Sequence, residues 1–272
     1  MLTLRLKHFV ISRFNIDIRQ YLSEYTSEQH ILWMRERLSL YFKYTYPTLL
    51  SQQNPEFQVI LLLDEFTSID LLSKIKLFDK NKIINFVFTS NKLLLLDLNR
   101  FLKKKVGFDE YLITTALDSD DGLMPWSIGR IQKEFVNANR APLGLNLSKG
   151  YIVNTNTGVF HIKSFLSNPF YSLCEKGGNF KTCYSKDHLY MSLEFETLEI
   201  DDFYYWIQNI HKGNLLNQVK GFPVLFFKTM PSEIRSIYGD VTISSYFLAF
   251  GLYFKSKLIN LIVKVRRLIS FF

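Results

Sequence analysis

The sequence predicts an α/β fold with a mainly parallel sheet flanked by helices, and three observations support this prediction. Strand-like apolar runs alternate with helix-like stretches about four times in the first half of the chain. The run over 57–63 is almost continuously apolar, which is typical of a strand buried on both faces. The strand-like run over 111–117 ends in clustered carboxylates, at the edge where open α/β sheets place their sites.

The elements of the first half follow in order. A first strand is expected over 7–12, with Arg13 and Asn15 just past its carboxyl end. The later elements are a helix over 28–44, a break at 45–47, a helical turn over 48–53, the strand over 57–63 ending at Asp64, a helix over 68–76, a strand over 83–88, a helix over 91–104 and the strand over 111–117.

The pattern changes in the second half. A helix is expected over 124–136, and a hairpin over 150–154 and 158–162. A further helix is expected to start near Asp187, and residues 244–272 are apolar and basic. We find no internal repeat and no composition break that would serve as a linker.

Charge and cysteine content narrow the function. The net charge of +8 suits an anionic partner such as a nucleotide, a nucleic acid or an acidic lipid. Cys174 and Cys183 lack the spacing of a zinc or redox motif, so two reduced thiols in a cytoplasmic protein are expected. The N-terminus lacks the apolar region of a signal peptide. No P-loop motif occurs, and the cations gather at the apolar C-terminus, which favours lipid over nucleic acid.

The acidic turn is the most informative motif. Asp118, Asp120 and Asp121 fall within four positions after the strand over 111–117, and Gly122 follows them. Like charges this close repel, whereas a divalent cation binds carboxylate and phosphate oxygens together. The turn therefore suggests metal-assisted chemistry on a nucleotide-linked phosphate. An Asp-rich surface turn is the alternative.

Several blocks resemble the bacterial rhamnosyltransferase family, a group of glycosyltransferases of the GT-A type. They are ordered along residues 7–217: His8–Asn15, Trp33–Arg37, Pro47 with Gln52, Phe57 and Asp64, Thr114–Asp121, Asn168–Leu173 and Trp206–Asn214. Ala116 departs from the family, in which many members have Arg. The resemblance implies a GT-A type, Rossmann-like fold with acceptor-side additions, and residues 1–240 as one domain. Its nucleotide-binding half would cover about 1–125 and its acceptor half about 126–240.

The resemblance also implies roles for individual residues. Asp120 and His211 would hold a divalent metal, Mn²⁺ or Mg²⁺, at the donor diphosphate. Asp118 would contact the ribose or a metal-bound water. Asp121 would face the sugar or orient its neighbours, and a helix cap is the alternative for it.

Polar residues at the carboxyl edge of the sheet complete the predicted donor site. Arg13 and Asn15 could read the base or a phosphate, and Asp64 could accept hydrogen bonds from the base or ribose. Polar residues also simply mark where strands meet solvent. Arg35 and Arg37 are expected to lie on a solvated helix face.

Transfer to a hydroxyl needs a base. We predict Asp187 for this role, with a helix N-cap as the alternative reading. Glu194, Glu196 and Asp202 are competing candidates.

Residues 241–272 form a predicted basic amphipathic segment. A polar stripe of Lys257, Asn260, Lys264 and Arg267 runs through apolar residues, which suits a helix in an anionic membrane surface. A helix packed on the domain or on a partner is the alternative.

These expectations combine into one function. The chain would be a metal-dependent, inverting glycosyltransferase that moves a sugar, rhamnose by the resemblance, from a nucleotide-sugar donor to a cell-surface glycan or lipid-linked acceptor. It would be cytoplasmic, peripheral on the inner face of the cell membrane, and without a nucleic-acid partner. The alternatives are a metal-dependent phosphoryl or nucleotidyl transferase and a non-enzymatic basic membrane-binding protein.

Overall fold

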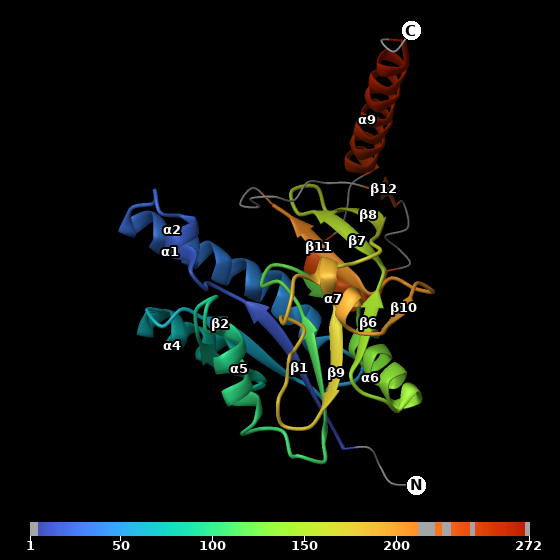
Figure 1. Cartoon of the computed structure of the whole chain (residues 1–272). Coiled ribbons are helices and arrows are strands. Elements are labelled where there is room, and N and C mark those ends of the chain that lie inside the picture. Colours follow the sequence, from blue (N-terminus) through green and yellow to red (C-terminus); the bar gives the residue numbers. More distant parts are fainter. Residues whose placement is uncertain (1–4, 212–220, 225–229, 240–242, 270–272) are drawn as a thin grey trace.

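The larger of two sheets is built from strands of both halves of the chain (Figure 1). The computed structural model describes residues 5–211, 221–224, 230–239 and 243–269. The spatial order of this sheet is β10-β6-β9-β4-β1-β2-β3. Its strands are β1 (Leu6–Arg13), β2 (Gln58–Leu63), β3 (Ile84–Phe88), β4 (Tyr111–Ala116), β6 (Leu143–Leu147), β9 (Ser172–Lys176) and β10 (Thr197–Ile200).

Strand directions confirm the predicted α/β fold with a mainly parallel sheet. Strands β1 to β4 all run parallel, so their carboxyl ends share one edge. Strand β9 is antiparallel to both of its neighbours, β4 and β6, and β10 is parallel to β6. The sequence predicted the strands of the first half and missed β6, β9 and β10.

A smaller sheet has the strand order β12-β8-β7-β11-β5. The acidic turn leads into this sheet, because β5 follows the turn directly. Its strands are β5 (Gly122–Leu123), β7 (Lys149–Asn154), β8 (Val159–Ser164), β11 (Trp206–Ile210) and β12 (Phe222–Pro223). Strands β7 and β8 form the predicted hairpin. Because β5 pairs with β11, the helix expected from 124 begins only at Ser127.

The helices lie mostly where the periodicity predicts them. Their bounds are α1 (Ile18–Tyr21), α2 (Ser27–Leu40), η1 (Tyr41–Thr45), α3 (Tyr46–Leu50), α4 (Ile69–Phe78), α5 (Leu94–Leu102), α6 (Ser127–Ala138), α7 (His188–Glu194), α8 (Ser232–Tyr238) and α9 (Ile243–Ile269). The predicted break at 45–47 is wrong. Helix α2 continues through the π-helical turn η1 into α3, and Pro47 lies at the start of α3 without ending the helix.

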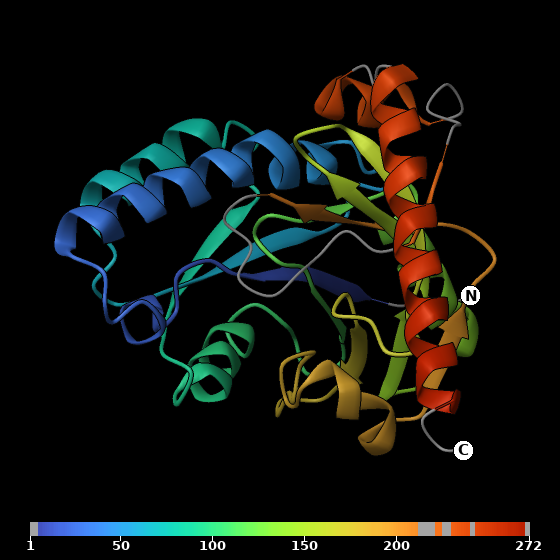
Figure 2. The ribbon, with the colours of Figure 1, turned by 90° about the horizontal axis from the view of Figure 1, so that it is seen from above.

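The core lies on both faces of the larger sheet. Alternate residues of a strand face opposite sides, so Val10 packs on the side of α2, α3, α4 and α6, whereas Phe9 and Ile11 pack on the side of α5. Figure 2 shows α2 and α4 side by side, with α5 across the sheet from them. Cys174 and Cys183 are buried free thiols, and burial raises the pKa of each to about 12.

Helix α9 lies at the outside of the molecule, next to β12 (Figures 1 and 2). Phe222 of β12 packs against Phe250 and Tyr253, with ring centroids 5.4 and 5.3 Å apart. Other apolar side chains of the helix are exposed, including Phe247 at 74%. Lys257 of the predicted stripe is exposed, whereas the side chains of Asn260, Lys264 and Arg267 lie outside the described residues. Within the described part of the chain, none of the helices is both long and apolar enough to span a bilayer.

A buried polar network ties four elements together beneath the site. His8 Nε2 lies 2.8 Å from Thr115 Oγ1, which lies 2.7 Å from Ser172 Oγ. Gln132 Nε2 of α6 lies 3.3 Å from His8 Nδ1. Burial lowers the pKa of His8 to about 3, so this imidazole is neutral in the folded protein at neutral pH.

The neutral His8 makes stability depend on pH. Below the unfolded pKa of about 6.5 the unfolded chain gains a proton that the folded chain does not accept, so stability is lost as the pH falls. We expect the free energy of unfolding to fall by up to about 1.4 kcal/mol per pH unit from this residue between pH 6 and pH 4. Denaturant unfolding at several pH values measures this slope. His8→Gln removes the titrating group and should flatten it; an unchanged slope would contradict the assignment.

Candidate functional site

The acidic turn connects β4 of the larger sheet to β5 of the smaller one. The backbone N–H of Asp121 donates to the carbonyl of Asp118 at 3.1 Å, which closes the turn. Gly122 is required by close packing, because a Cβ there would lie 2.9 Å from Thr48 of α3. Pairing of β5 with β11 brings the turn beside the last residues of β11.

Asp121 is buried and connects the turn to β11 through a hydrogen bond. Asn209 donates its backbone N–H to Asp121 Oδ1 at 2.7 Å and its side-chain amide to the Asp120 carbonyl at 2.6 Å. Burial raises the pKa of Asp121 well above its ordinary value, and repulsion from Asp120 and Asp118 adds to this. Asp121 therefore fixes the turn to β11. The alternative of a cap for α6 is wrong, because the N-cap position of α6 is Trp126.

Asp120 is held between two nitrogen groups from distant parts of the chain. Its Oδ2 lies 2.7 Å from Nη1 of Arg37 and 3.0 Å from Nε2 of His211. Burial opposes ionisation of this carboxyl group, but His211 and Arg37 outweigh the burial, so the pKa of Asp120 is lowered. Asp120 is therefore a buried carboxylate that stays ionised.

Arg37 contacts the acidic turn, a position that was not predicted from the sequence. Its side chain is only 24% exposed, so the expectation of a solvated face is wrong for this position. The guanidinium lies 5.2 Å from the ring centroid of Trp33, one helical turn earlier on α2. An Arg four residues after a Trp on a helix was the available signal, but helical spacing alone does not say what the helix faces.

Asp118 differs from Asp120 and Asp121 because it is exposed to solvent. The protein packed around it nevertheless raises its pKa to about 6, and repulsion from Asp120 adds to this. Arg37 and Arg13 act in the opposite direction. The turn therefore combines one ionised carboxylate, Asp120, with two carboxyl groups, Asp118 and Asp121, whose pKa values are raised. A further cation would favour their ionised forms.

The donor set at the turn fits a divalent ion in part. Among the residues that the structure describes, no group of three or more His, Cys, Asp or Glu side chains is arranged to hold a metal. Asp120 Oδ2 and His211 Nε2 are 3.0 Å apart. Two neighbouring ligands of an octahedral ion at 2.0–2.1 Å are separated by about 3 Å, so these two atoms could share one ion. Such ions commonly take one or two protein ligands and complete their shell with substrate phosphates.

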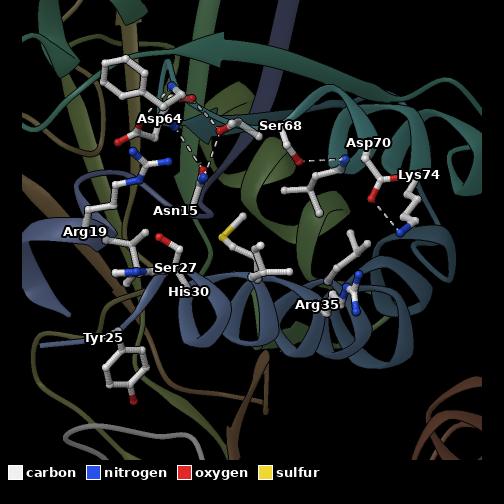
Figure 3. A pocket seen from close by; sticks show the side chains of 17 residues that line it. Asn15, Arg19, Tyr25, Ser27, His30, Arg35, Asp64, Ser68, Asp70 and Lys74 are labelled. Atoms are coloured by element: carbon white, nitrogen blue, oxygen red, sulfur yellow. Dashed lines mark hydrogen bonds and ion pairs between the residues drawn. The ribbon is translucent and has the colours of Figure 1, made fainter. Parts of the chain in front are cut away.

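A pocket of about 410 Å³ lies between α2, α4 and the carboxyl ends of β1 and β2 (Figure 3). Asn15 and Asp64 both line it, at the end opposite Asp70 and Lys74. Asn15 accepts a hydrogen bond from the Asp64 backbone N–H at 3.1 Å and donates to Thr67 Oγ1 at 2.9 Å. The structure therefore brings together Asn15 and Asp64, as predicted from the parallel strands.

Arg13 lies apart from Asn15, on the side of the acidic turn. Its guanidinium stacks 4.6 Å from the centroid of Tyr184. The Tyr184 hydroxyl donates to the Ile11 carbonyl at 3.1 Å, and the Cys183 N–H donates to Thr114 Oγ1 at 2.9 Å. The loop before α7 is thus fixed to the ends of β1 and β4. Tyr184 was not predicted from the sequence.

Asp187 follows this loop as the N-cap of α7. It is exposed, and its Oδ1 accepts a hydrogen bond from the Leu189 N–H at 3.0 Å and lies 3.2 Å from His188 Nδ1. The capping alternative therefore describes its contacts in this structure. The competing carboxylates all have cationic partners: Glu194 lies near Lys181 and Lys186, Glu196 near Arg140, and Asp202 near Arg130.

Solved structures with some likeness to the chain include two transferases. TarS residues 1–349 from S. aureus, in complex with UDP-GlcNAc, has a TM-score of 0.42 at 14% identity over 76% of this chain, and the chain spans 60% of its length. A “putative nucleotide-diphospho-sugar transferase” from Desulfovibrio desulfuricans G20 gives 0.39 at 10% identity, over 77% of this chain and 83% of that chain. These TM-scores are too low to establish a shared fold, so the fold assignment rests on the strand order described above.

Comparison with protein families gives a direct result. No curated protein sequence matches the chain. The family model described as “Putative rhamnosyl transferase” matches residues 20–221, which include every predicted site residue except Arg13 and Asn15. This span is well over half of the chain and supports the transferase class over a non-enzymatic protein. The chain belongs to the family described as “Putative rhamnosyl transferase”.

Proposed function

We propose that this protein is a metal-dependent glycosyltransferase that moves a sugar, rhamnose by its family, from a nucleotide-sugar donor to a glycan or lipid-linked acceptor. The single observation that carries the proposal is the buried, ionised Asp120 held between His211 and Arg37. A carboxylate at the carboxyl edge of a parallel sheet, with cations around it, is suited to a diphosphate and its counter-ion.

The donor would occupy two adjoining regions. Its nucleoside would enter the pocket of Figure 3, where Asp64 and Asn15 offer polar atoms among apolar side chains. Its diphosphate would lie at the acidic turn, where Arg13, two residues before Asn15 in the chain, is near Asp118. Helix α2 lines the pocket through Met34 and reaches Asp120 through Arg37, so it spans both regions.

Asp120 and His211 would hold the divalent ion. When bound, this ion would offset the negative charge that develops on the leaving nucleoside diphosphate. Arg37 balances Asp120 in the ligand-free protein, and we propose that it turns to the donor phosphates when the ion takes over that balance. Asp121, tied to Asn209, keeps the turn in place throughout.

Asp187 is proposed to take the proton from the acceptor hydroxyl. Its loop is attached to the sheet edge beside Arg13 through Tyr184. Its exposed carboxylate is bonded to a backbone N–H and a histidine rather than to Lys or Arg, unlike those of its three competitors.

The first prediction concerns the donor site. Asp120→Asn or His211→Ala should weaken the manganese-dependent binding of UDP or dTDP by about tenfold or more, because even residues behind a metal ligand contribute that much. Arg37→Leu should weaken binding of the same diphosphates without metal as well. Isothermal titration with and without Mn²⁺ measures both effects, and a screen of nucleotide sugars for Mn²⁺-dependent transfer tests the activity itself.

Asp109→Asn, an exposed carboxylate in the loop before β4, serves as the control and should bind like the parent protein. Parent-like, metal-dependent nucleotide binding in both Asp120→Asn and His211→Ala would remove the basis of the proposal.

The second prediction separates chemistry from binding. Asp187→Asn should lower kcat by roughly two to four decades, as is typical for a general base, with little change in donor affinity. Asn is also a good N-cap, so α7 should remain capped. Glu194→Gln is the matched control. Loss of nucleotide binding in Asp187→Asn, or unchanged turnover, would assign the base elsewhere.

The third prediction concerns the anionic membrane surface. We propose that α9 lies on the inner face of the cell membrane, because residues 255–267 hold five cations and no anion and the helix exposes apolar residues such as Leu252 and Leu258. Deleting residues 255–272 should abolish sedimentation with phosphatidylglycerol vesicles and leave donor hydrolysis mostly intact. Phosphatidylcholine vesicles and the charge variant Lys255→Glu/Lys257→Glu are the controls. Persistent sedimentation of the folded truncated protein would show that α9 is not the anchor.

A further inference from the structure

A second cavity, of about 780 Å³, lies at the start of β11 and is lined mainly by aromatic and other apolar side chains. It opens between the start of α6, Tyr151 of β7, the loop before β11 and the residues just before α8. Its lining residues are Met124, Trp126, Arg130, Tyr151, Asp202, Phe203, Tyr204, Tyr205, Met230 and Pro231. We call it the aromatic pocket.

The aromatic side chains of this pocket are held in fixed orientations. Tyr151 and Tyr204 stack with centroids 4.6 Å apart, and Trp126 and Phe203 meet edge to face at 5.0 Å. The indole N–H of Trp126 donates to the Tyr204 carbonyl at 2.9 Å. Phe203 is nevertheless 53% exposed, so a large apolar ring lies at the surface.

Polar groups at the same pocket form a network in which carboxylates outnumber the cation. Arg130 lies 2.8 Å from Asp202 and 2.7 Å from Glu134. Asp202 Oδ1 also accepts a hydrogen bond from the Tyr205 hydroxyl at 2.7 Å. The cation is therefore matched by carboxylates, which leaves no excess positive charge for a phosphate. The Asp202 side chain is 56% exposed, and a carboxylate can accept about four hydrogen bonds.

A neutral saccharide has the chemistry that this pocket matches. One face of a sugar ring presents C–H groups, which pack on aromatic rings, while its hydroxyls donate to a carboxylate and accept from an arginine. Ligand sites of this size are typically apolar with a few polar groups that fix orientation. We infer that the aromatic pocket binds a neutral sugar unit. Phe203 and Trp126 would pack against the ring, and the Asp202 carboxylate would accept hydrogen bonds from its hydroxyl groups.

The position of the pocket defines which sugar this would be. Tyr205 and His211 flank the two ends of β11, and at about 3.3 Å per residue they are about 20 Å apart. One sugar cannot reach both places, so the unit bound here is not the donor sugar. It would belong to an acceptor chain of several units. This last step rests on the proposed glycosyltransferase function, whereas saccharide binding itself does not.

Isothermal titration of the full-length protein with neutral oligosaccharides of rhamnose, glucose and N-acetylglucosamine tests the inference. At least one should bind, and saturating UDP with Mn²⁺ should not displace it. Phe203→Ala and Asp202→Asn should each weaken binding about five- to tenfold, on the scale of one aromatic contact or hydrogen bond. Phe108→Ala, which removes an exposed ring outside this pocket, is the matched control.

Asp120→Asn separates the two proposals, because it should retain oligosaccharide binding whatever its effect on transfer. Absence of binding to every oligosaccharide, or parent-like binding by Phe203→Ala, overturns the inference. Displacement by UDP with Mn²⁺ also overturns it, because the sugar would then lie at the donor site. Binding of an apolar peptide in place of any saccharide would assign the pocket to a protein partner and overturn it as well.

Discussion

The charge balance around Asp120 is the constraint on which the rest of this site depends. A buried carboxylate stays ionised only when cations or hydrogen-bond donors compensate for its lost hydration. Here the compensation comes from Arg37 and His211, which lie far from Asp120 in the sequence and on different elements. The site therefore exists only when α2, the β4–β5 turn and the end of β11 are all assembled.

The two sheets meet this requirement through one short strand. Strand β5 contains only Gly122 and Leu123, yet it pairs with β11 and thereby places Asn209 on the acidic turn. The larger sheet supplies the carboxylates and the smaller sheet supplies the groups that orient them. A change in the pairing of β5 would disturb all three aspartates together.

The sequence allowed prediction of the parts that depend on local patterns. Strands β1, β2 and β4 are buried parallel strands with apolar runs, and the acidic turn follows β4. Strand β3, which was expected to be buried, is a half-buried strand at the edge of the sheet. Strands β6, β9 and β10 escaped prediction because polar residues or glycine interrupt their apolar residues, as Gly144 and Asn146 do in β6 and Glu175 does in β9. Arg37 and Tyr184 escaped for a related reason. Arg37 lies on a helix whose periodicity does not say what that face contacts, and Tyr184 lies in a loop, where no periodicity exists.

The π-helical turn η1 has a consequence for how this chain can vary in length. A π turn accommodates one residue more than an α turn, and each residue rotates an α-helix by about 100°. On one side of η1, Arg37 reaches Asp120; on the other, Thr48 accepts a hydrogen bond from the Leu123 N–H at 3.2 Å. Loss of one residue from 41–45 would restore regular winding and turn one contact away from the acidic turn. The spacing between these two residues is thus as constrained as their identity.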